Sequence, residues 1–212
     1  MKKDLSILIP ARDEMFLAHT IQDILENIEA DTEVIAVLDG GWADPPVRQH
    51  ERVNIIYVPK SIGQRAATNL ACKLSKAKYV MKVDAHCSFD KGFDRKMLEG
   101  FKRVGDNVTM VPLMRNLWAF DWICKECNKG VRVYQDRPSI CPVCGAQMKK
   151  RIIWVGKRRP QSYAYCFDSE PHFQYFRKYN RRSEYKKSLK KTGCTETMSL
   201  QGSCFMLTRK KY

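Results

Sequence analysis

The stretch from Tyr79 to His86 constrains the fold of this chain more than any other. Tyr79–Val83 has the apolar composition of a buried β-strand, and Asp84 and His86 follow it directly. Residues two apart in an extended chain point to the same side, so both side chains would face one spot at the carboxyl end of the strand. A carboxylate and an imidazole there can bind a divalent cation such as Mn²⁺. The alternative is a turn-forming aspartate beside a solvated histidine.

Strand and helix patterns alternate through the first half of the chain. Continuous apolar runs indicate strands at Leu5–Ile9, Glu33–Leu38 and Val53–Val58, ahead of the strand at 79–83. Helical spacing indicates one helix over residues 15–29 and a second that begins at Gly63. The residues expected to face inward on the second helix are Ala66, Ala67, Leu70 and Leu74. This βαβ alternation predicts a Rossmann-like α/β fold with a mostly parallel sheet and flanking helices. A further strand is expected at Val108–Val111.

Three of these strands end in charged or glycine-rich residues. The three loops are Arg12–Glu14, Asp39–Gly41 and Asp84–His86. Parallel strands end at one edge, where open α/β sheets bind ligands, so the loops would form a cleft for a nucleotide. Asp39 can accept from a base N–H or a ribose hydroxyl, and a cation at Asp84 and His86 can offset the charge of a diphosphate. Gly63 is either a helix N-terminus that favours an anion or a plain turn glycine.

Four segments together resemble the GT-A glycosyltransferases of family 2. They are residues 6–14, 37–44, 63–69 and 83–86, which follow the family's order within about residues 5–101. Most of that family has Asp-x-Asp as its metal motif. The Asp-x-His form here is similar to that of the polypeptide N-acetylgalactosaminyltransferases. Residues 201–209 are similar to the segment that lines the sugar site in those enzymes.

The resemblance implies a metal-dependent glycosyltransferase with a nucleotide-sugar donor, UDP favoured, an unknown acceptor, and Mn²⁺ or Mg²⁺ as cofactor. It implies catalytic and metal-binding roles for Asp84 and His86, and sugar binding by Gln201 and Gly202. The residues that it places around the nucleotide are Pro10, Ala11, Arg12, Glu14, Asp39, Gly63, Arg65 and Asn69.

The chain departs from the family's pattern at three places. Leu38 stands where the family often has aspartate, and Thr68 stands where it often has arginine, for which Arg65 would substitute. The relatives also continue past the position of Tyr212. We therefore expect the chain to be truncated, with the catalytic base beyond its end and the mechanism, retaining or inverting, unassigned.

Two Cys-x-x-Cys pairs, Cys124 with Cys127 and Cys141 with Cys144, are separated by thirteen residues. Each pair can lie on a tight turn that aims two thiolates at one centre, and four thiolates suit a structural Zn²⁺. We expect an inserted zinc ribbon with strands at Val131–Tyr134 and Ile152–Val155; unpaired thiols or disulfides are the alternatives. A four-cysteine site has no open position, so this zinc would stabilise the fold and take no part in catalysis.

The formal net charge of +15 predicts an anionic partner. Much of the excess lies in residues 149–191, where basic residues alternate with aromatic ones. Such a region can bind nucleic acid or sugars, or be a solvated loop. In the glycosyltransferase interpretation it is a mobile acceptor loop, and His172 is either a third metal ligand or a surface residue. We divide the chain into a nucleotide-sugar-binding core (1–115), a zinc ribbon (116–156), a basic and aromatic loop region (157–198) and a core strand of the sugar site (199–212).

An alternative function is nucleic-acid binding through the zinc ribbon, with an inactive α/β core. The net charge favours this alternative, but nucleic-acid binding does not explain the cleft that the three loops form. A nucleotidyltransferase is a third possibility, and the absence of a Gly-rich phosphate loop argues against it. No stretch approaches the roughly 18 apolar residues of a membrane span. Nine cysteines without a secretion signal predict reduced thiols or metal ligands and a cytoplasmic protein.

Overall fold

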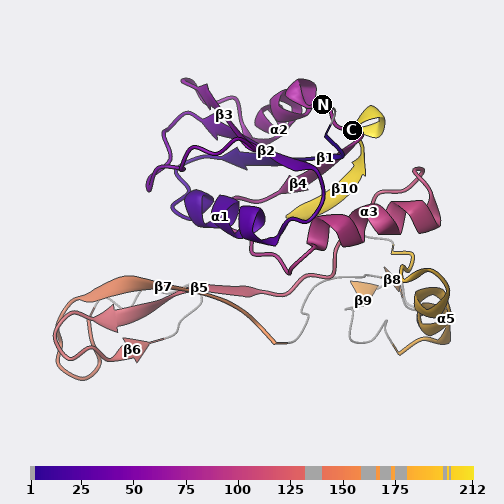
Figure 1. Cartoon of the computed structure of the whole chain (residues 1–212). Helices are drawn as coiled ribbons and strands as arrows, with labels where there is room; N and C mark the ends of the chain where they lie inside the picture. The colour runs from indigo at the N-terminus through magenta and orange to yellow at the C-terminus, as the bar shows by residue number, and fades with distance from the viewer. Residues whose placement is uncertain are drawn as a thin grey trace. The chain divides into compact units, whose positions relative to one another are not determined.

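The structure of the chain, a computed structural model, describes residues 3–131, 140–158, 166–167, 173–174, 181–197, 200 and 202–212. It contains two compact units, Met1–Met114 with Gln161–Tyr212, and Arg115–Pro160 (Figure 1). The larger unit is built on a five-stranded sheet and the smaller on a three-stranded one.

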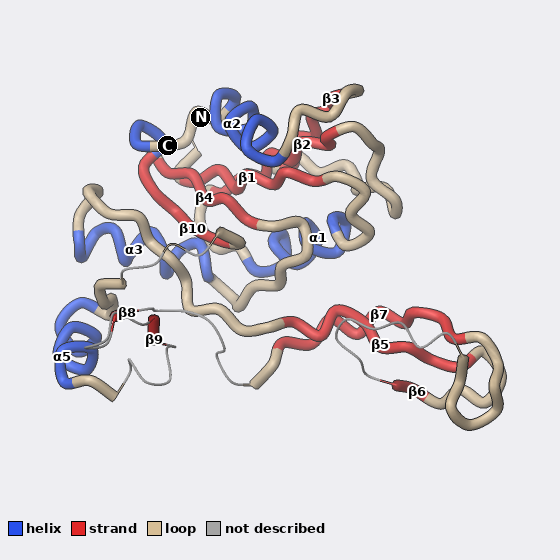
Figure 2. Tube along the Cα trace, turned by 180° about the vertical axis from the view of Figure 1, so that it is seen from behind, coloured by secondary structure: helices blue, strands red, loops and turns tan. Residues whose placement is uncertain are grey.

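The larger unit is an α/β layer structure. Its main elements are β1 (Leu5–Ala11), α1 (Leu17–Asn27), β2 (Thr32–Asp39), β3 (Val53–Val58), α2 (Gln64–Leu74), β4 (Tyr79–Val83), α3 (Phe93–Val104), β10 (Cys204–Thr208) and a 3₁₀ turn (Arg209–Lys211). The strand order is β10-β4-β1-β2-β3; β1 to β4 run parallel and β10 is antiparallel to β4. α1 and α3 cover one face and α2 the other (Figures 1 and 2). The predicted fold class is confirmed.

The central strands are buried on both faces because helices cover both sides of the sheet. Along β1, Ile7 and Ile9 pack into the apolar cluster that contains α1 and α3, whereas Leu8 packs into the cluster on the α2 side. This two-sided burial explains the continuous apolar run in the sequence, where a one-sided sheet would show alternation. The edge strand β3 is less covered, and Ile55 and Tyr57 are exposed on it.

The predicted inward face of α2 is correct for Ala67, which is buried, and for Leu70, which packs partly buried against the cluster on that side. It is wrong for Ala66 and Leu74, which are exposed; the other buried residues of the helix are Thr68, Ala71 and Cys72. Small side chains on the buried face let the helix pack close to β1 and β2, and this close fit outweighs the burial of one leucine.

The predicted strand at Val108–Val111 is also wrong. In this segment only Met110 pairs with a strand, through reciprocal backbone hydrogen bonds of 2.7 and 2.8 Å with Met206 of β10. A single bridge fixes the segment beside the sheet edge without extending the sheet by a full strand.

Asp94, at the start of α3, is a fully buried carboxylate that fastens the turn between α1 and β2. It accepts hydrogen bonds from the backbone N–H groups of Glu29 and Ala30, each at 3.0 Å, and from Thr32 Oγ1 at 2.7 Å. Its own helix donates from the N–H of Arg95 at 2.8 Å. A charge at this depth is tolerated because hydrogen-bond donors surround it.

Replacing Asp94 with asparagine should lower the free energy of unfolding by about 2–4 kcal/mol. In the variant the amide NH₂ group would face backbone N–H groups, which would lose the carboxylate oxygen that accepts from them in the wild-type chain. Urea denaturation followed by circular dichroism measures the change. Glu99→Gln, at an exposed position of the same helix, should change the free energy by less than about 0.5 kcal/mol. Equal effects of the two substitutions would contradict the fastening role.

The smaller unit is an antiparallel sheet in the order β6-β5-β7. Its strands are β5 (Leu117–Cys124), β6 (Gly130–Val131) and β7 (Met148–Gly156). β7 contains the predicted strand at 152–155. β6 contains the first residue of the one predicted at 131–134, and residues 132–139 lie outside the described part of the chain. β5 was not predicted. Among the described residues of this unit, Trp122, Cys124, Cys141 and Met148 form the buried cluster, and Asp121 and Ile123 are also buried.

The remaining described elements belong to the basic and aromatic region. β8 (Cys166–Phe167) and β9 (Phe173–Gln174) pair antiparallel, and α5 (Ser183–Thr192) has no buried residue and contacts α3. His172 lies outside the described residues, as do most of the aromatic residues of this region. Among the helices in the described ranges, none combines the length and apolar character needed to cross a bilayer.

Candidate functional site

A cavity of about 330 Å³ lies at the carboxyl ends of β1, β2 and β4. The residues that line it are Pro10, Ala11, Arg12, Glu14, Asp39, Gly63, Gln64, Asp84, Ala85 and His86. All three polar loops singled out in the sequence contribute to it. Its volume is within the range of small-molecule sites, at the lower end.

Three residues expected at the nucleotide or sugar are not in the lining of this cavity. Arg65 and Asn69 occupy exposed positions of α2. The carbonyl oxygen of Gly202 accepts a hydrogen bond from Lys82, which in turn is bound to Asp84 of the lining. Gln201 lies outside the described residues.

Asp84 and His86 are brought together at the end of β4. Asp84 Oδ2 lies 3.9 Å from His86 Nε2. Adjacent ligand atoms of one octahedral Mg²⁺, at bond lengths of about 2.1 Å, lie about 3 Å apart. The pair is wider than this by about 1 Å, a difference that a rotation of the exposed His86 side chain can close. One carboxylate oxygen and one imidazole nitrogen are also ligand types that Mn²⁺ accepts.

Glu14 holds the imidazole of His86 from its other side. Glu14 Oε2 lies 2.9 Å from His86 Nδ1. A hydrogen bond donated by Nδ1–H places the lone pair on Nε2, the tautomer that a metal-binding histidine needs, and such carboxylate partners are typical of metal sites. The same hydrogen bond raises the pKa of His86 above its usual value, against the effect of burial. The sequence indicated Glu14 as a nucleotide contact and did not reveal this pairing.

Asp39 shapes the cavity wall. It is buried, and its carboxylate accepts from Ser61 Oγ at 2.9 Å and from the N–H groups of Ile62 and Gly63 at 2.6 and 2.9 Å. Burial acts to raise the pKa of Asp39, but these hydrogen bonds outweigh it and lower the pKa. Asp39 therefore fastens the turn before α2 to the end of β2, and a nucleotide base would share an oxygen that already has a donor.

Gly40 permits this close approach of the two loops. Its φ is +94°, and a Cβ at this position would lie 3.2 Å from Ser61 Cβ. Only glycine takes up that backbone conformation without strain. Gly40 of the predicted turn Asp39–Gly41 is therefore needed for the packing of the two loops at the cavity wall.

Lys82 contacts the site from within the sheet. Its Nζ is bound to Asp84 Oδ1 and, at 2.7 Å, to the carbonyl oxygen of Gly202. Its side chain is only 6% exposed. This ion pair was not predicted, although a lysine inside an otherwise apolar strand was a visible signal.

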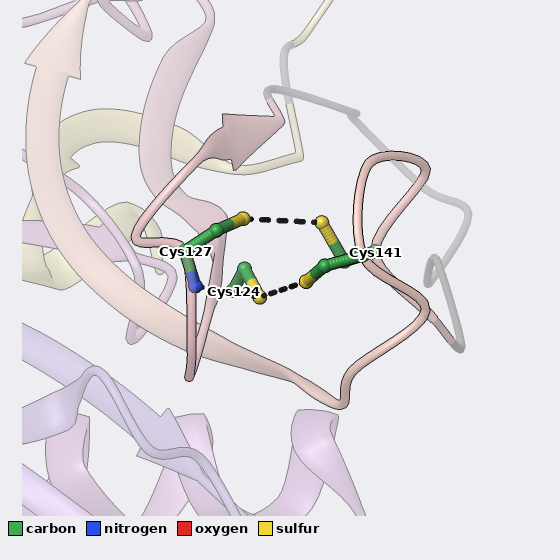
Figure 3. A group of neighbouring side chains, drawn as sticks. Cys124, Cys127 and Cys141 are labelled. Atoms are coloured by element: carbon green, nitrogen blue, oxygen red, sulfur yellow. Dashed lines mark hydrogen bonds between the residues drawn. The ribbon is translucent and has the colours of Figure 1, made fainter.

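The four cysteines of the smaller unit form one cluster. Cys124 Sγ lies 3.4 Å from Cys144 Sγ, and Cys127 Sγ lies 3.5 Å from Cys141 Sγ (Figure 3). All four sulfur atoms are within 4.8 Å of one another. Tetrahedral zinc with Zn–S bonds of about 2.3 Å separates its sulfurs by about 3.8 Å, so the donor set fits Zn²⁺.

Backbone N–H groups stabilise two of these thiols as thiolates. Burial raises the pKa of Cys124, but the N–H groups of Cys127 and Glu126 outweigh it and lower the pKa to about 6. The N–H groups of Val143 and Cys144 likewise lower the pKa of Cys141. Thiolates are the form that binds metal, so the turns favour Cys124 and Cys141 as ligands. A backbone hydrogen bond from Lys129 acts to lower the pKa of Cys127, but burial and the neighbouring thiols outweigh it and raise that pKa.

Comparison with known proteins finds a family whose profile matches the chain. The sequence profile described as Glycosyl transferase family 2 matches residues 6–123, which is more than half of the chain. The matched range includes all three loops of the cavity. No curated protein sequence matches the chain.

Two solved structures with similar folds are crystal structures from S. aureus, of TarS and of TarS 1-349, each 14% identical to this chain. The first alignment covers 48% of this chain and 20% of TarS, with a TM-score of 0.38. The second covers 56% of this chain and 41% of the TarS fragment, with a TM-score of 0.42. The chain therefore spans less than half the length of either.

Proposed function

The chain belongs to glycosyl transferase family 2, and from this premise we propose that it is a metal-dependent glycosyltransferase that uses a nucleotide-diphosphate sugar, with UDP as the nucleotide. In this proposal Asp84 and His86 hold Mn²⁺ or Mg²⁺, and the base and ribose lie against Pro10–Glu14 and the wall that Asp39 supports. The sugar lies toward Gln201 and Gly202.

One observation carries the proposal: Asp84 Oδ2 and His86 Nε2 lie 3.9 Å apart in the lining of a cavity at the carboxyl edge of the sheet, where the loops that follow β1 and β2 also contribute polar side chains. A hydrogen bond donated by His86 Nδ1 to Glu14 would leave Nε2 available to a cation.

Glycosyl transfer needs charge stabilisation on the donor. The bond between the anomeric carbon and a diphosphate oxygen breaks, the acceptor oxygen bonds to that carbon, and the acceptor's proton passes to a base. A bound divalent cation would stabilise the negative charge that gathers on the departing diphosphate. The chain's own residues contribute orientation: Glu14 holds His86, Lys82 holds one oxygen of Asp84, and Asp39 holds the loop in front of α2.

Ligand-dependent thermal stability tests the proposal. Because a cation held by only two protein ligands gains further ligands from a diphosphate, UDP and Mn²⁺ together should raise the melting temperature by several degrees, whereas either alone should raise it by less than about one degree. Differential scanning fluorimetry measures both. ADP in place of UDP is the matched control for the base, and we expect a smaller shift with it.

A flat response to UDP and Mn²⁺ would contradict the proposal. If the chain instead binds random-sequence DNA with an affinity that falls steeply with salt, nucleic-acid binding through the basic residues of the smaller unit becomes the better explanation. If UDP and Mn²⁺ together do raise the melting temperature, hydrolysis of a panel of nucleotide sugars would identify the sugar.

A further inference from the structure

Lys82 is a buried lysine inside a β-strand, a position that is unusual for a charged side chain. It lies in β4, near the centre of the sheet, with Leu8 of β1 and Phe205 of β10 as its cross-strand neighbours. Its side chain is 6% exposed. A buried ammonium is costly to the fold unless it is paired, so its partners indicate what it does.

One partner of Lys82 lines the candidate site, and the other belongs to the segment expected on the sugar side. Strand alternation puts Lys82 and Asp84 on the same side of β4, so Nζ reaches forward to Asp84 Oδ1. The second contact, at 2.7 Å, is the carbonyl oxygen of Gly202, just ahead of β10. Lys82 thus joins the predicted cation site to the predicted sugar-side segment.

The ion pair leaves Asp84 with two unequal oxygens. Oδ1 is bound to Lys82, whereas Oδ2 is the oxygen that lies 3.9 Å from His86 Nε2. Lys82 therefore turns one oxygen toward the cation position. Its positive charge also offsets that of Asp84. Without a nucleotide, a divalent cation would therefore meet an aspartate whose negative charge is already paired.

A diphosphate supplies the missing charge. Even in the dielectric of water, a unit charge and a divalent ion roughly 6 Å apart repel enough to change a binding constant by about tenfold. Added phosphate oxygens would provide both ligands and negative charge to the cation. The arrangement thus favours a cation that binds together with the donor over one that binds to the empty protein.

We propose that Lys82 is a positioning residue that acts through Asp84 and makes the filling of the cation site depend on the nucleotide diphosphate. This inference rests on the proposed function, because it assumes a cation at Asp84 and His86. It concerns how that site is regulated, and binding measurements test it without any transferase assay.

Electron paramagnetic resonance of free Mn²⁺, with and without saturating UDP, tests the inference on the whole chain. Binding of Mn²⁺ to UDP in buffer is measured separately and subtracted. The wild-type chain should bind Mn²⁺ at least tenfold more tightly with UDP than without. Lys82→Gln and Lys82→Met should bind Mn²⁺ alone at least fivefold more tightly than wild type, because both remove the charge. Lys82→Arg, which keeps the charge, should behave as wild type.

The outcomes separate this inference from the proposed function. Failure of the wild-type chain to bind Mn²⁺ with UDP, or full retention of that binding by Asp84→Ala, overturns the proposed function and this inference with it. If wild type and Asp84→Ala behave as proposed but both neutral Lys82 variants bind Mn²⁺ alone as weakly as wild type, the inference about Lys82 alone is overturned. Zinc content and circular dichroism show whether each variant is folded.

Discussion

Replacing Asp84 with alanine is expected to weaken Mn²⁺-dependent UDP binding at least 100-fold while leaving the zinc content unchanged. The substitution removes the carboxylate oxygen that faces His86 Nε2 at 3.9 Å. It also leaves the Lys82 ammonium, previously paired with Asp84, as an uncompensated positive charge beside the cation position. Both changes oppose a cation, so their effects on affinity should act in the same direction. Isothermal titration of UDP at saturating Mn²⁺ measures the loss.

Asp90→Ala is the matched control for this experiment. Asp90 follows the same strand a few residues later, but its side chain is 73% exposed and its partner is Lys96 on the surface. The Asp90→Ala chain should bind UDP and Mn²⁺ as the wild-type chain does. Asp84→Asn, which keeps the size of the side chain, should lose binding as Asp84→Ala does. Retained binding in both Asp84 variants would mean that the nucleotide or the cation is bound elsewhere.

The βαβ order could be predicted from the sequence, since apolar periodicity and short connections restrict the topology strongly. The proximity of Asp84 and His86 was expected from alternation along an extended chain. β4 ends at Val83 and His86 lies in a turn, so the 3.9 Å between the two side chains depends on that turn. The arrival of Arg12, Asp39 and Asp84 at one edge then follows from parallel strands.

The contacts that give the site its electrostatics could not be predicted in this way. The pairing of Glu14 with His86 joins loops that are 72 residues apart in sequence and depends on how each loop turns. Asp39 was expected to face a ligand, yet its oxygens accept from a turn 22 to 24 residues later. Turn conformation depends on such hydrogen bonds, and periodicity carries no information about them.

Lys82 was predictable in part. A lysine within the otherwise apolar run of β4 conflicts with the pattern around it, and such conflicts tend to occur at functional positions. The partner could have been inferred too, because Asp84 is two residues ahead on the same side of the strand. The role of Gly202 could not, since that contact spans 120 residues.

Cys141→Ser is expected to remove zinc from the smaller unit and to unfold that unit. Cys141 is buried, and its thiol is one of the two whose pKa is lowered by backbone N–H groups. A serine hydroxyl does not provide the thiolate that zinc requires. In the described part of the unit, the buried cluster consists of Trp122, Cys124, Cys141 and Met148, with Phe120, Val131 and Ala146 packed against it. So small a core cannot replace the roughly 10–16 kcal/mol that a structural zinc contributes to such modules.

Zinc analysis should show about one zinc per wild-type chain and less than about 0.2 per Cys141→Ser chain, with new protease cleavage confined to residues 115–160. Cys194→Ser is the control, because Cys194 is a free thiol outside the cluster, and it should keep its zinc. A Cys141→Ser chain that keeps its zinc, or that loses it without new cleavage, would contradict the structural role.

The cavity in the larger unit is lined by none of the four cysteines. The shift in melting temperature with UDP and Mn²⁺ should therefore persist in Cys141→Ser, and its loss would mean that nucleotide binding depends on the folded zinc unit.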